Sequence, residues 1–396
     1  MSSARSAYIH IPFCSHRCGY CNFTLVAGRD ELIPAFLTAL AGELAHTLGE
    51  PQSVDTIFLG GGTPTHLPPQ SLEQLLQLLA HWLKLEAGGE YSCEANPLDC
   101  TAQRLGLLRD YGVNRISLGG QSFNDAKLLK LERDHSGSQL AQALERCHEI
   151  FPRVALDLIF ASPEETLAEW QADVAMAVAS PVSHLSTYGL TIERGSAFYG
   201  RTLRNELHEL TPELQLEMYE HAIDELTACG WEHYEVSNFA CPGERCRHNE
   251  AYWMGSPWWA FGPGAASFEH AADGQTFTRR VNHRSTTTYI RKQRHGEPLI
   301  SESDQLSRED FVRERFVFGL RRLAGVDLAE LNRWWGGSVR DLFEPHLSQY
   351  IERNWLAQTG DTIYLTRTGL VISDGLWPDL LDGVDESRHR ERRIAH

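Results

Sequence analysis

The first 240 residues alternate short apolar, β-branched runs with amphipathic segments of helix length. The short runs are typical of buried strands, and each is followed by a segment long enough for one helix, which is the pattern of strand–helix units around a parallel sheet. Strands are predicted at residues 7–11, 56–59, 90–95, 115–118, 154–159 and 184–190. Six such units predict an α/β fold built as a partial β/α barrel.

Two of the predicted helices carry signals at their ends. Leucines at three-and-four spacing predict a helix over SLEQLLQLLAHWL, with Ser71 as its N-cap. A second helix is predicted over TPELQLEMYEHAIDELTACG, starting at Pro212 after Thr211 and ending before Gly230.

The rest of the chain follows other patterns. Residues 241–300 are dense in Gly, Pro and Trp and break the alternation, which predicts a linker region that bears a site. Helical patterns and the Gly-centred hairpin WLAQTGDTIYLTR predict a small winged-helix-like α+β domain over residues 301–384. Residues 385–396 are predicted to form a charged tail. The barrel domain is therefore expected to span residues 1–240.

Composition and charge narrow the classes of function. The 396 residues are 42% hydrophobic, which allows a large buried core. The sequence lacks an apolar run of about 18 residues and starts without a secretory signal, so we expect a cytoplasmic protein. The net charge of -17 opposes long-range attraction to phosphate backbones. We therefore expect no nucleic-acid partner, although winged-helix domains often bind DNA.

Three of the nine cysteines, Cys14, Cys18 and Cys21, fall at C-x3-C-x2-C spacing directly after the first predicted strand. One short loop can then present three thiolates to a 4Fe-4S cluster and leave the fourth iron without a protein ligand. The amine and carboxylate of S-adenosylmethionine can chelate that iron. The alternatives are a zinc site completed by His10 or His16, or free thiols.

A second motif, TIFLGGGTPTHLPP, follows one strand–helix unit later. Gly60, Gly61 and Gly62 end an apolar strand and allow the backbone to approach a ligand closely, while Thr63 adds a hydroxyl. The motif lacks the Lys-Ser/Thr ending of a Walker loop. A tight turn without a ligand is the alternative.

Together, the segments YIHIPFC, GGGTP, CEANP, RISLGGQSF and ALDLIF resemble oxygen-independent coproporphyrinogen III oxidase and its relatives in the radical SAM superfamily, over nearly the whole chain. The resemblance implies a radical SAM barrel. It also implies that one set of residues contacts S-adenosylmethionine or a second ligand beside it: Tyr8, Gly61, Gly62, Thr63, Glu94, Gln121, Arg133 and Asp157. The alternative for each polar residue is an ordinary hydrogen bond at a strand end.

Two features indicate a branch of this family. The oxidase has a further cysteine where this chain has Phe23, and the stretch RHNEAYW resembles the HNxxYW signature of HemW-type haem chaperones. That resemblance implies haem binding by His248, Asn249, Tyr252 and Trp253, with His248 as the axial ligand and Cys246 as second choice. Trp253, Trp258, Trp259 and Phe261 offer flat apolar area for a porphyrin. The alternative is an aromatic core around a hydrogen-bonded turn.

The sequence thus predicts a haem chaperone that carries a 4Fe-4S cluster and S-adenosylmethionine and passes haem to an apo-haemoprotein, possibly a respiratory one. Such a protein would use an electron donor such as flavodoxin or ferredoxin, and a partner could bring it transiently to a membrane surface. The alternative is an enzyme that decarboxylates coproporphyrinogen III by radical chemistry, or that performs other radical chemistry on a tetrapyrrole.

Overall fold

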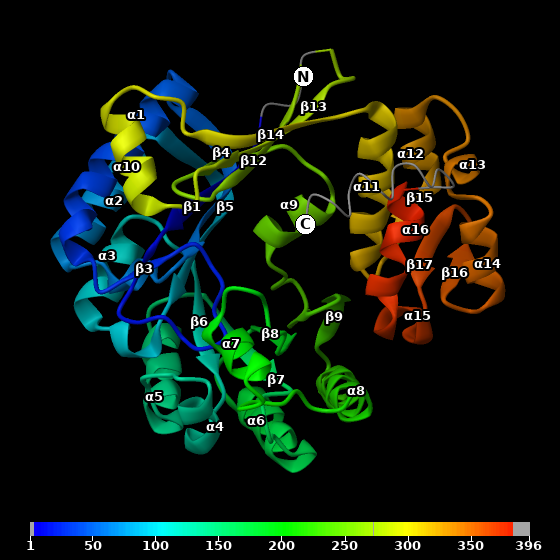
Figure 1. Cartoon of the computed structure of the whole chain (residues 1–396), viewed down its shortest axis with the longest axis horizontal. Coiled ribbons are helices and arrows are strands. Elements are labelled where there is room, and N and C mark those ends of the chain that lie inside the picture. The colour runs from blue at the N-terminus through cyan, green and yellow to red at the C-terminus, as the bar shows by residue number, and fades with distance from the viewer. Residues whose placement is uncertain (1–3, 272, 383–396) are drawn as a thin grey trace.

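The computed structural model describes residues 4–271 and 273–382. Its centre is a sheet in the order β14-β13-β12-β11-β1-β4-β5-β6-β7-β8-β10-β9. A second, three-stranded sheet belongs to the C-terminal domain, which stands to one side of the large sheet (Figure 1). In the described residues no helix has the length and hydropathy of a membrane span.

All six predicted strands of the barrel are present, in parallel and in chain order. They are β1 (Ser6–Ile11), β4 (Gln52–Gly61), β5 (Leu83–Ala95), β6 (Arg115–Gln121), β7 (Arg153–Phe160) and β8 (His184–Gly189). The sheet does not close, because β1 pairs with β11 and β8 pairs with β10. The prediction of a partial barrel is confirmed.

Helices follow the strands and cover the outer side of the sheet (Figure 1). They are α1 (Ile33–Leu48), α2 (Pro69–Trp82), α3 (Ala102–Asp110), α4 (Asp125–Lys130), α5 (Gly137–His148), α6 (Leu167–Ala179) and α8 (Pro212–Ala228). The short helix α7 (Ala197–Leu203) instead packs on the loop after β1, where the Phe198 amide donates to the Gly19 carbonyl at 2.8 Å. Thr211 caps α8 by accepting a hydrogen bond from the Leu214 amide, as predicted. Ser71 is not an N-cap: α2 begins at Pro69, whose fixed φ and missing N–H suit the first turn, so Ser71 lies inside the helix.

Residues 241–300 differ from the expected linker region. Three strands in this stretch, β11 (Trp258–Phe261), β12 (Ala266–His270) and β13 (Phe277–Asn282), continue the large sheet beyond β1 and lead to β14 (Ile300–Leu306). Gly and Pro lie between these strands, and the strand sequences WWAF, ASFEH and FTRRVN contain few β-branched residues, which is why the sequence reads as loop. The stretch also holds α9 (Arg247–Trp253) and α10 (Thr286–Arg294), and it follows β9 (Glu232–Glu235) and β10 (Asn238–Ala240).

The C-terminal domain combines several helices with a small sheet in the order β15-β17-β16. Its elements are α11 (Arg308–Arg321), β15 (Val326–Asp327), α12 (Leu328–Trp335), α13 (Arg340–Phe343), α14 (His346–Glu352), β16 (Leu356–Thr359), β17 (Thr362–Leu365), α15 (Arg367–Val371) and α16 (Trp377–Asp382). Phe311 of α11 stacks on Phe277 of β13 with ring centroids 3.7 Å apart, so the domain packs against the extended sheet. The predicted charged tail lies outside the described residues.

Candidate functional site

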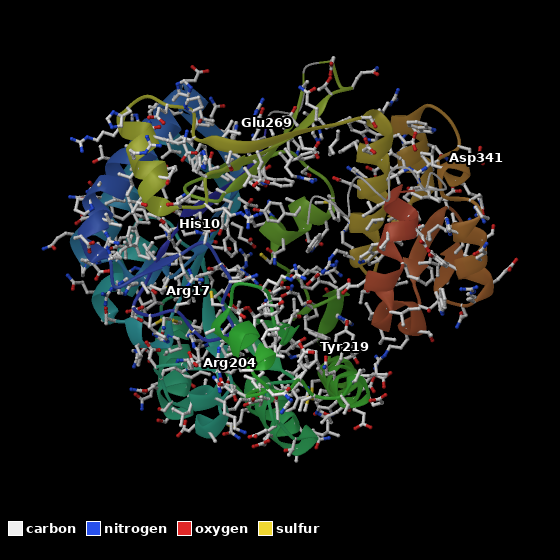
Figure 2. The ribbon with its side chains drawn as sticks, viewed as in Figure 1. His10, Arg17, Arg204, Tyr219, Glu269 and Asp341 are labelled. Atoms are coloured by element: carbon white, nitrogen blue, oxygen red, sulfur yellow. The ribbon has the colours of Figure 1, made fainter. Side chains whose placement is uncertain are left out.

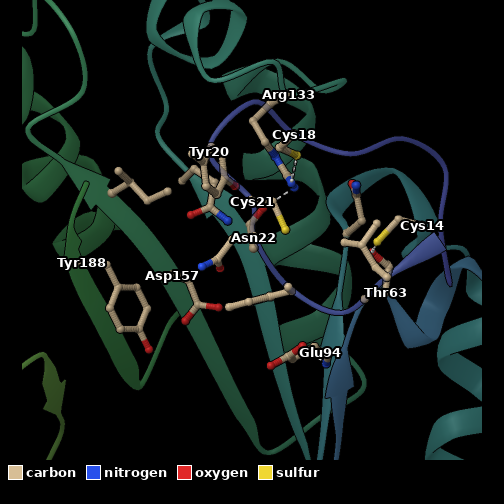
Figure 3. A pocket seen from close by; sticks show the side chains of 18 of the residues that line it. Cys14, Cys18, Tyr20, Cys21, Asn22, Thr63, Glu94, Arg133, Asp157 and Tyr188 are labelled. Carbon is tan, nitrogen blue, oxygen red and sulfur yellow. Dashed lines mark hydrogen bonds between the residues drawn. The ribbon is translucent and has the colours of Figure 1, made fainter. Parts of the chain in front are cut away.

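A cavity of about 570 Å³, called here the main cavity, opens at the carboxyl ends of the parallel strands. Ligands of open α/β sheets bind at this edge. The structure brings together there the three cysteines of the loop and every residue predicted to contact S-adenosylmethionine except Tyr8. These lining residues are Cys14, Cys18, Cys21, Gly61, Gly62, Thr63, Glu94, Gln121, Arg133 and Asp157 (Figure 3).

The cysteines lie on a loop closed at its base by β2 (Phe13–Cys14) and β3 (Val26–Ala27), which pair in parallel. Arg17, labelled in Figure 2, folds this loop upon itself. Its guanidinium donates to the backbone carbonyls of Cys21, Phe23 and Leu25 at 3.3, 3.2 and 2.9 Å. One side chain thereby fixes the backbone between and beyond the thiols.

Polar groups from other strands meet two of the thiols. The hydroxyl of Thr63 lies 3.3 Å from Cys14 Sγ, and Arg133 Nη1 donates to Cys18 Sγ at 3.3 Å. Burial raises the pKa of Cys14 to about 11 and also raises the pKa of Cys21. Iron ligation therefore has to displace thiol protons, and a guanidinium beside the sulfurs stabilises the resulting thiolate charge. This donor set fits an iron–sulfur cluster.

The two histidines of the zinc alternative have other partners. His10 Nε2 lies 2.6 Å from the Thr24 carbonyl oxygen. His16 Nε2 lies 2.7 Å from the Glu132 carbonyl oxygen and 3.7 Å from Cys18 Sγ, so its shorter contact is with the backbone. In the described residues no three His, Cys, Asp or Glu side chains are grouped so as to hold a single metal ion. A cluster needs no such convergence, because each thiolate binds a different iron.

The glycines at the end of β4 allow the backbone of the cysteine loop to pack closely against this strand. The amides of Gly62 and Thr63 donate to the carbonyls of Ile11 and Phe13, both at 2.8 Å. A Cβ at Gly62 would lie 2.7 Å from both carbonyl oxygens, and Gly61 has φ +104°. Close approach of the β1–β2 backbone thus requires glycine here, in addition to any approach of a ligand.

Two carboxyl groups face the main cavity from below the cysteine loop (Figure 3). Glu94 accepts a hydrogen bond from the Gly61 amide at 3.0 Å, and Ser117 donates to Asp157 at 3.4 Å. Burial, followed by the nearby charge of Asp157, raises the pKa of Glu94 to about 8, and burial raises the pKa of Asp157 to about 6. Both groups can exchange a proton near neutral pH.

A second cavity of about 220 Å³ adjoins the first, and Glu94, Asp157 and Tyr188 line both. Tyr8 lines this second cavity and not the main one, with its hydroxyl 3.2 Å from His10 Nδ1. The predicted place of Tyr8 beside the sulfonium therefore has no support from the geometry.

The predicted haem residues do not form one surface. His248, Asn249 and Tyr252 of α9 line the second cavity. Trp253 instead faces the C-terminal domain, where the guanidinium of Arg321 lies 4.6 Å from the centre of its ring. The motif is split because residues of a helix point in different directions around its axis.

His248 is buried, and both of its ring nitrogens have partners. Nδ1 lies 2.8 Å from the Thr56 hydroxyl and Nε2 lies 2.8 Å from the Tyr252 hydroxyl. The ring stacks on Phe58 with centroids 5.2 Å apart, and burial lowers the pKa of His248 to about 3. The imidazole is thus neutral but closed to a ligand in this arrangement. The second choice, Cys246, is also buried, and its thiol donates to Glu90 at 3.6 Å.

The other aromatic residues of this stretch do not offer the expected flat area. Trp258 donates its Nε1–H to the Ala266 carbonyl at 2.7 Å and packs against Phe268. Trp259 is the next residue of the same strand and points to the opposite face of the sheet. Phe261 is buried. These rings belong to the packing between β11 and its neighbours.

Sequence reasoning missed several residues of the main cavity, among them Tyr20, Asn22 and Tyr188. Tyr188 lies at the carboxyl end of a correctly predicted strand, where site residues of parallel sheets gather, so its position was a usable signal. Tyr20 and Asn22 lie beside the cysteines on the same loop.

Comparison with known proteins identifies the class. Residues 8–177 match the Radical SAM superfamily and residues 306–372 match the HemN C-terminal domain. The solved structure of coproporphyrinogen III oxidase (HemN) from Escherichia coli, a radical SAM enzyme, superposes with a TM-score of 0.82 at 21% identity, covering 95% of this chain and 89% of that one. The fold is that of a radical SAM protein, a superfamily whose cofactors are a 4Fe-4S cluster and S-adenosylmethionine.

The sequence relatives identify the family within this superfamily. The protein named heme chaperone HemW from Bacillus subtilis is 34% identical over 93% of this chain and 97% of its own, and its namesake from Escherichia coli is 31% identical over 94% and 96%. A Bos taurus protein named radical S-adenosyl methionine domain-containing protein 1, mitochondrial, is 31% identical over 98% of this chain and 89% of its own. The chain belongs to the HemW family.

Proposed function

We propose that this protein is a haem chaperone, which binds haem and transfers it to an apo-haemoprotein, and that it holds a 4Fe-4S cluster and S-adenosylmethionine in the main cavity. The observation that carries the proposal is its similarity, along almost the whole chain, to proteins named heme chaperone HemW. Three thiols of one loop at the edge of a large cavity support the cofactor part of it.

Cys14, Cys18 and Cys21 are the proposed ligands of three irons, and the fourth iron is left for the amine and carboxylate of S-adenosylmethionine. When bound and reduced, this pair supplies cleavage of the sulfonium bond to a 5′-deoxyadenosyl radical. The residues of this chain would bind the two cofactors and orient them. Arg133, which donates to Cys18 Sγ, would stabilise the Cys18 thiolate, and Glu94 and Asp157 on the cavity wall would offset the positive charge of the sulfonium. An electron donor such as flavodoxin or ferredoxin would reduce the cluster.

Haem binding by α9 requires a rearrangement. The second cavity, at about 220 Å³, is smaller than the roughly 300–1,000 Å³ of pockets for small organic ligands. His248 must also release the Tyr252 hydroxyl before Nε2 can bind iron. The neutral imidazole that burial favours is the form that ligates metals. We therefore propose that α9 moves away from Phe58 when His248, Asn249, Tyr252 and Trp253 engage haem.

A haem titration followed by the Soret band tests this site. We expect a Soret shift with the wild-type protein and its loss in His248→Ala. Tyr252→Phe should bind haem at least as tightly, because it keeps the aromatic ring that would contact the porphyrin and removes the hydroxyl that occupies His248 Nε2. The exposed His81→Ala variant serves as the control and should behave as wild type. A wild-type protein that shows no haem-dependent shift would overturn the chaperone proposal. A His248→Ala variant with the same Soret shift as the wild type would show that His248 is not the haem ligand.

Formation of protoporphyrinogen IX distinguishes the enzymatic alternative from the chaperone proposal. Anaerobic incubation with reductant, S-adenosylmethionine and coproporphyrinogen III is expected to yield no protoporphyrinogen IX. Formation of that product with 5′-deoxyadenosine would replace the chaperone proposal with oxidative decarboxylation. In a parallel assay, haem-loaded protein is expected to convert an apo-haemoprotein, such as one of the respiratory chain at the membrane surface, to its holo form.

A further inference from the structure

Two residues at neighbouring strand ends adopt a backbone conformation that side chains disfavour. Gln121 ends β6 with φ +66°, and Ala161 follows β7 with φ +62°. Residues other than glycine occupy this left-handed region only where surrounding structure holds them there, and such positions concentrate at functional sites. Gln121 lines the main cavity, so the first of these bends shapes its wall.

The residue after each bend is held by a buried carboxylate. Asp173 of α6 accepts from the Ser122 hydroxyl at 2.6 Å and from the Phe123 amide at 2.7 Å. Glu165 accepts from the amide and the hydroxyl of Ser162 at 2.8 and 3.0 Å. The two bends are thus secured in the same manner by two different acids.

One lysine joins the two acids. Lys127 Nζ of α4 lies 2.5 Å from Glu165 Oε1 and 3.0 Å from Asp173 Oδ2. The three side chains are only 3%, 1% and 2% exposed. Two buried acids at this distance from one cation are held together by it, because the ammonium donates a hydrogen bond to each of them. We call this set the ion trio.

The same lysine also anchors α4, which leads to another wall of the main cavity. The Arg133 amide donates to the Leu128 carbonyl at 2.9 Å, just after this helix. The Arg133 guanidinium then reaches the Gly119 carbonyl at 2.8 Å and Cys18 Sγ at 3.3 Å. The ion trio therefore connects the elements that carry Gln121, the end of β7 and Arg133.

We infer that Lys127, Glu165 and Asp173 are positioning residues that hold Gln121 and Arg133 in place for S-adenosylmethionine in the main cavity. The inference rests on the proposed cofactor function. The trio is buried behind the strand ends and acts through the backbone, because none of its members lines the main cavity.

The chain offers a matched control on the same elements. Lys130 of α4 pairs with Glu164 at 2.9 Å, but these side chains are 42% and 82% exposed. An exposed pair of this kind contributes little to either stability or geometry. Lys130→Met therefore removes the same charge from the same helix without touching the bends.

The test compares Ser122→Ala, Lys127→Met and Lys130→Met after anaerobic reconstitution. Three quantities are measured: iron content, melting temperature, and the Kd for S-adenosylmethionine from its perturbation of the reduced-cluster spin signal. Ser122→Ala removes one contact of Asp173 and the hydrogen bond that the Ser122 hydroxyl accepts from the Asn124 amide at 2.9 Å. It leaves every charge of the trio paired, so it keeps the experiment informative if Lys127→Met does not fold.

We expect Ser122→Ala to load iron as wild type does but to raise the Kd for S-adenosylmethionine on the order of tenfold, because misplacement of a binding group costs affinity steeply. Lys127→Met should raise it further, and Lys130→Met should leave it unchanged. Adding Ala161→Gly to Lys127→Met should recover part of the affinity, since glycine adopts that bend without strain.

The outcomes separate the two proposals. If Ser122→Ala and a folded Lys127→Met bind S-adenosylmethionine as tightly as wild type, whatever their melting temperatures, the trio is only structural and the inference is overturned. If the wild-type protein itself loads no cluster or binds no S-adenosylmethionine, the proposed cofactor function fails and the inference fails with it.

Discussion

Glu94 of β5 and Asp157 of β7 share the wall between the two cavities, and the charge of Asp157 adds to burial in raising the pKa of Glu94. With a pKa of about 8 for Glu94 and about 6 for Asp157, the pair holds one proton and one negative charge near neutral pH. A cation placed beside them changes that distribution, because it favours the ionised form of both groups.

The first prediction concerns the pH dependence of cofactor binding. S-adenosylmethionine carries a positive sulfonium, so its binding beside Glu94 favours the carboxylate and releases a proton whenever Glu94 is protonated beforehand. Its affinity should therefore rise as pH increases from about 6 to about 8, by at most about tenfold per pH unit for one proton. The Kd measured across this pH range on the reconstituted protein checks the prediction.

Glu94→Gln is the corresponding variant. It removes the ionisable group and should bind S-adenosylmethionine more weakly at pH 8, with a flatter pH profile. A profile as steep as that of the wild type would assign the proton to another group, with Asp157 as the first to examine.

The second prediction concerns the cysteine loop. Serine at Cys14, Cys18 or Cys21 removes one thiolate ligand, and each variant should lose the iron–sulfur absorbance and most of the iron of the reconstituted protein. Cys229→Ser is the matched control, because this exposed cysteine lies on none of the cavity walls and should retain wild-type iron content. Full iron retention in the three loop variants would contradict the cluster.

The third prediction concerns the glycine that touches this loop. In Gly62→Ala the added Cβ would lie 2.7 Å from the carbonyl oxygens of Ile11 and Phe13, and backbone cannot yield as a side chain does. We expect a loss of roughly 1–3 kcal/mol of stability, as for other overpacked sites, together with reduced iron loading.

Gly106→Ala is the control for this variant. It places a Cβ on α3 with nothing within 4 Å, and alanine is the better helix former, so this variant should be at least as stable as the wild type. Urea unfolding and iron analysis of the two variants make the comparison. A Gly62→Ala protein with normal stability and iron would show that the loop has room to move.

The fourth prediction concerns a buried carboxyl group that lines neither cavity. Glu43 of α1 accepts hydrogen bonds from the Gly262 amide at 2.8 Å, Asn282 Nδ2 at 2.6 Å and the Tyr289 hydroxyl at 2.6 Å. Burial raises its pKa from 4.5 to about 7. The folded state then binds this proton more tightly than the unfolded chain, so the contribution of Glu43 to the free energy of unfolding falls as pH rises from about 4.5 to about 7.

Glu43→Gln removes this proton. The variant is expected to be less stable at low pH, because the NH2 of its amide cannot accept a hydrogen bond, whereas both oxygens of the protonated carboxyl group can. It is also expected to lose less stability than the wild type between about pH 5 and pH 8. Chemical unfolding at the two pH values measures both effects, with the exposed Glu50→Gln as control. Equal pH dependence in wild type and Glu43→Gln would show that Glu43 is ionised throughout.

Much of the fold follows from local pattern. The six parallel strands were predicted in their right places, because buried strands of a parallel sheet are nearly continuous apolar runs that stand out between amphipathic helices. The prediction for β5 covered only its second half, since the strand begins at Leu83 and not at residue 90. The limits of that approach appear at Trp258–Phe261 and its neighbours β12 and β13. β12 and β13 pair with their neighbours in the chain, and only β11 pairs with a strand distant in sequence, β1. The Gly and Pro between these strands look like loop.

The candidate site could likewise be predicted only in part from the sequence. The spacing of the cysteines and the Gly-rich strand end identified one part of the main cavity, and the family resemblance added Glu94, Gln121, Arg133 and Asp157. These residues lie together because residues that follow successive parallel strands gather at one edge. The sequence did not show that Tyr8 would face the second cavity, or that both nitrogens of His248 would be occupied by Thr56 and Tyr252. Those contacts depend on how α9 packs on β4.

The sequence alone determined the order of the barrel units, the loop that presents Cys14, Cys18 and Cys21, and the family, because these depend on residue type and spacing along the chain. Only the tertiary structure decided that Lys127 would join Glu165 and Asp173 behind two strained strand ends, and that burial would raise the pKa of Glu94. Ion pairing and desolvation depend on distances between residues far apart in sequence, and packing alone sets those distances.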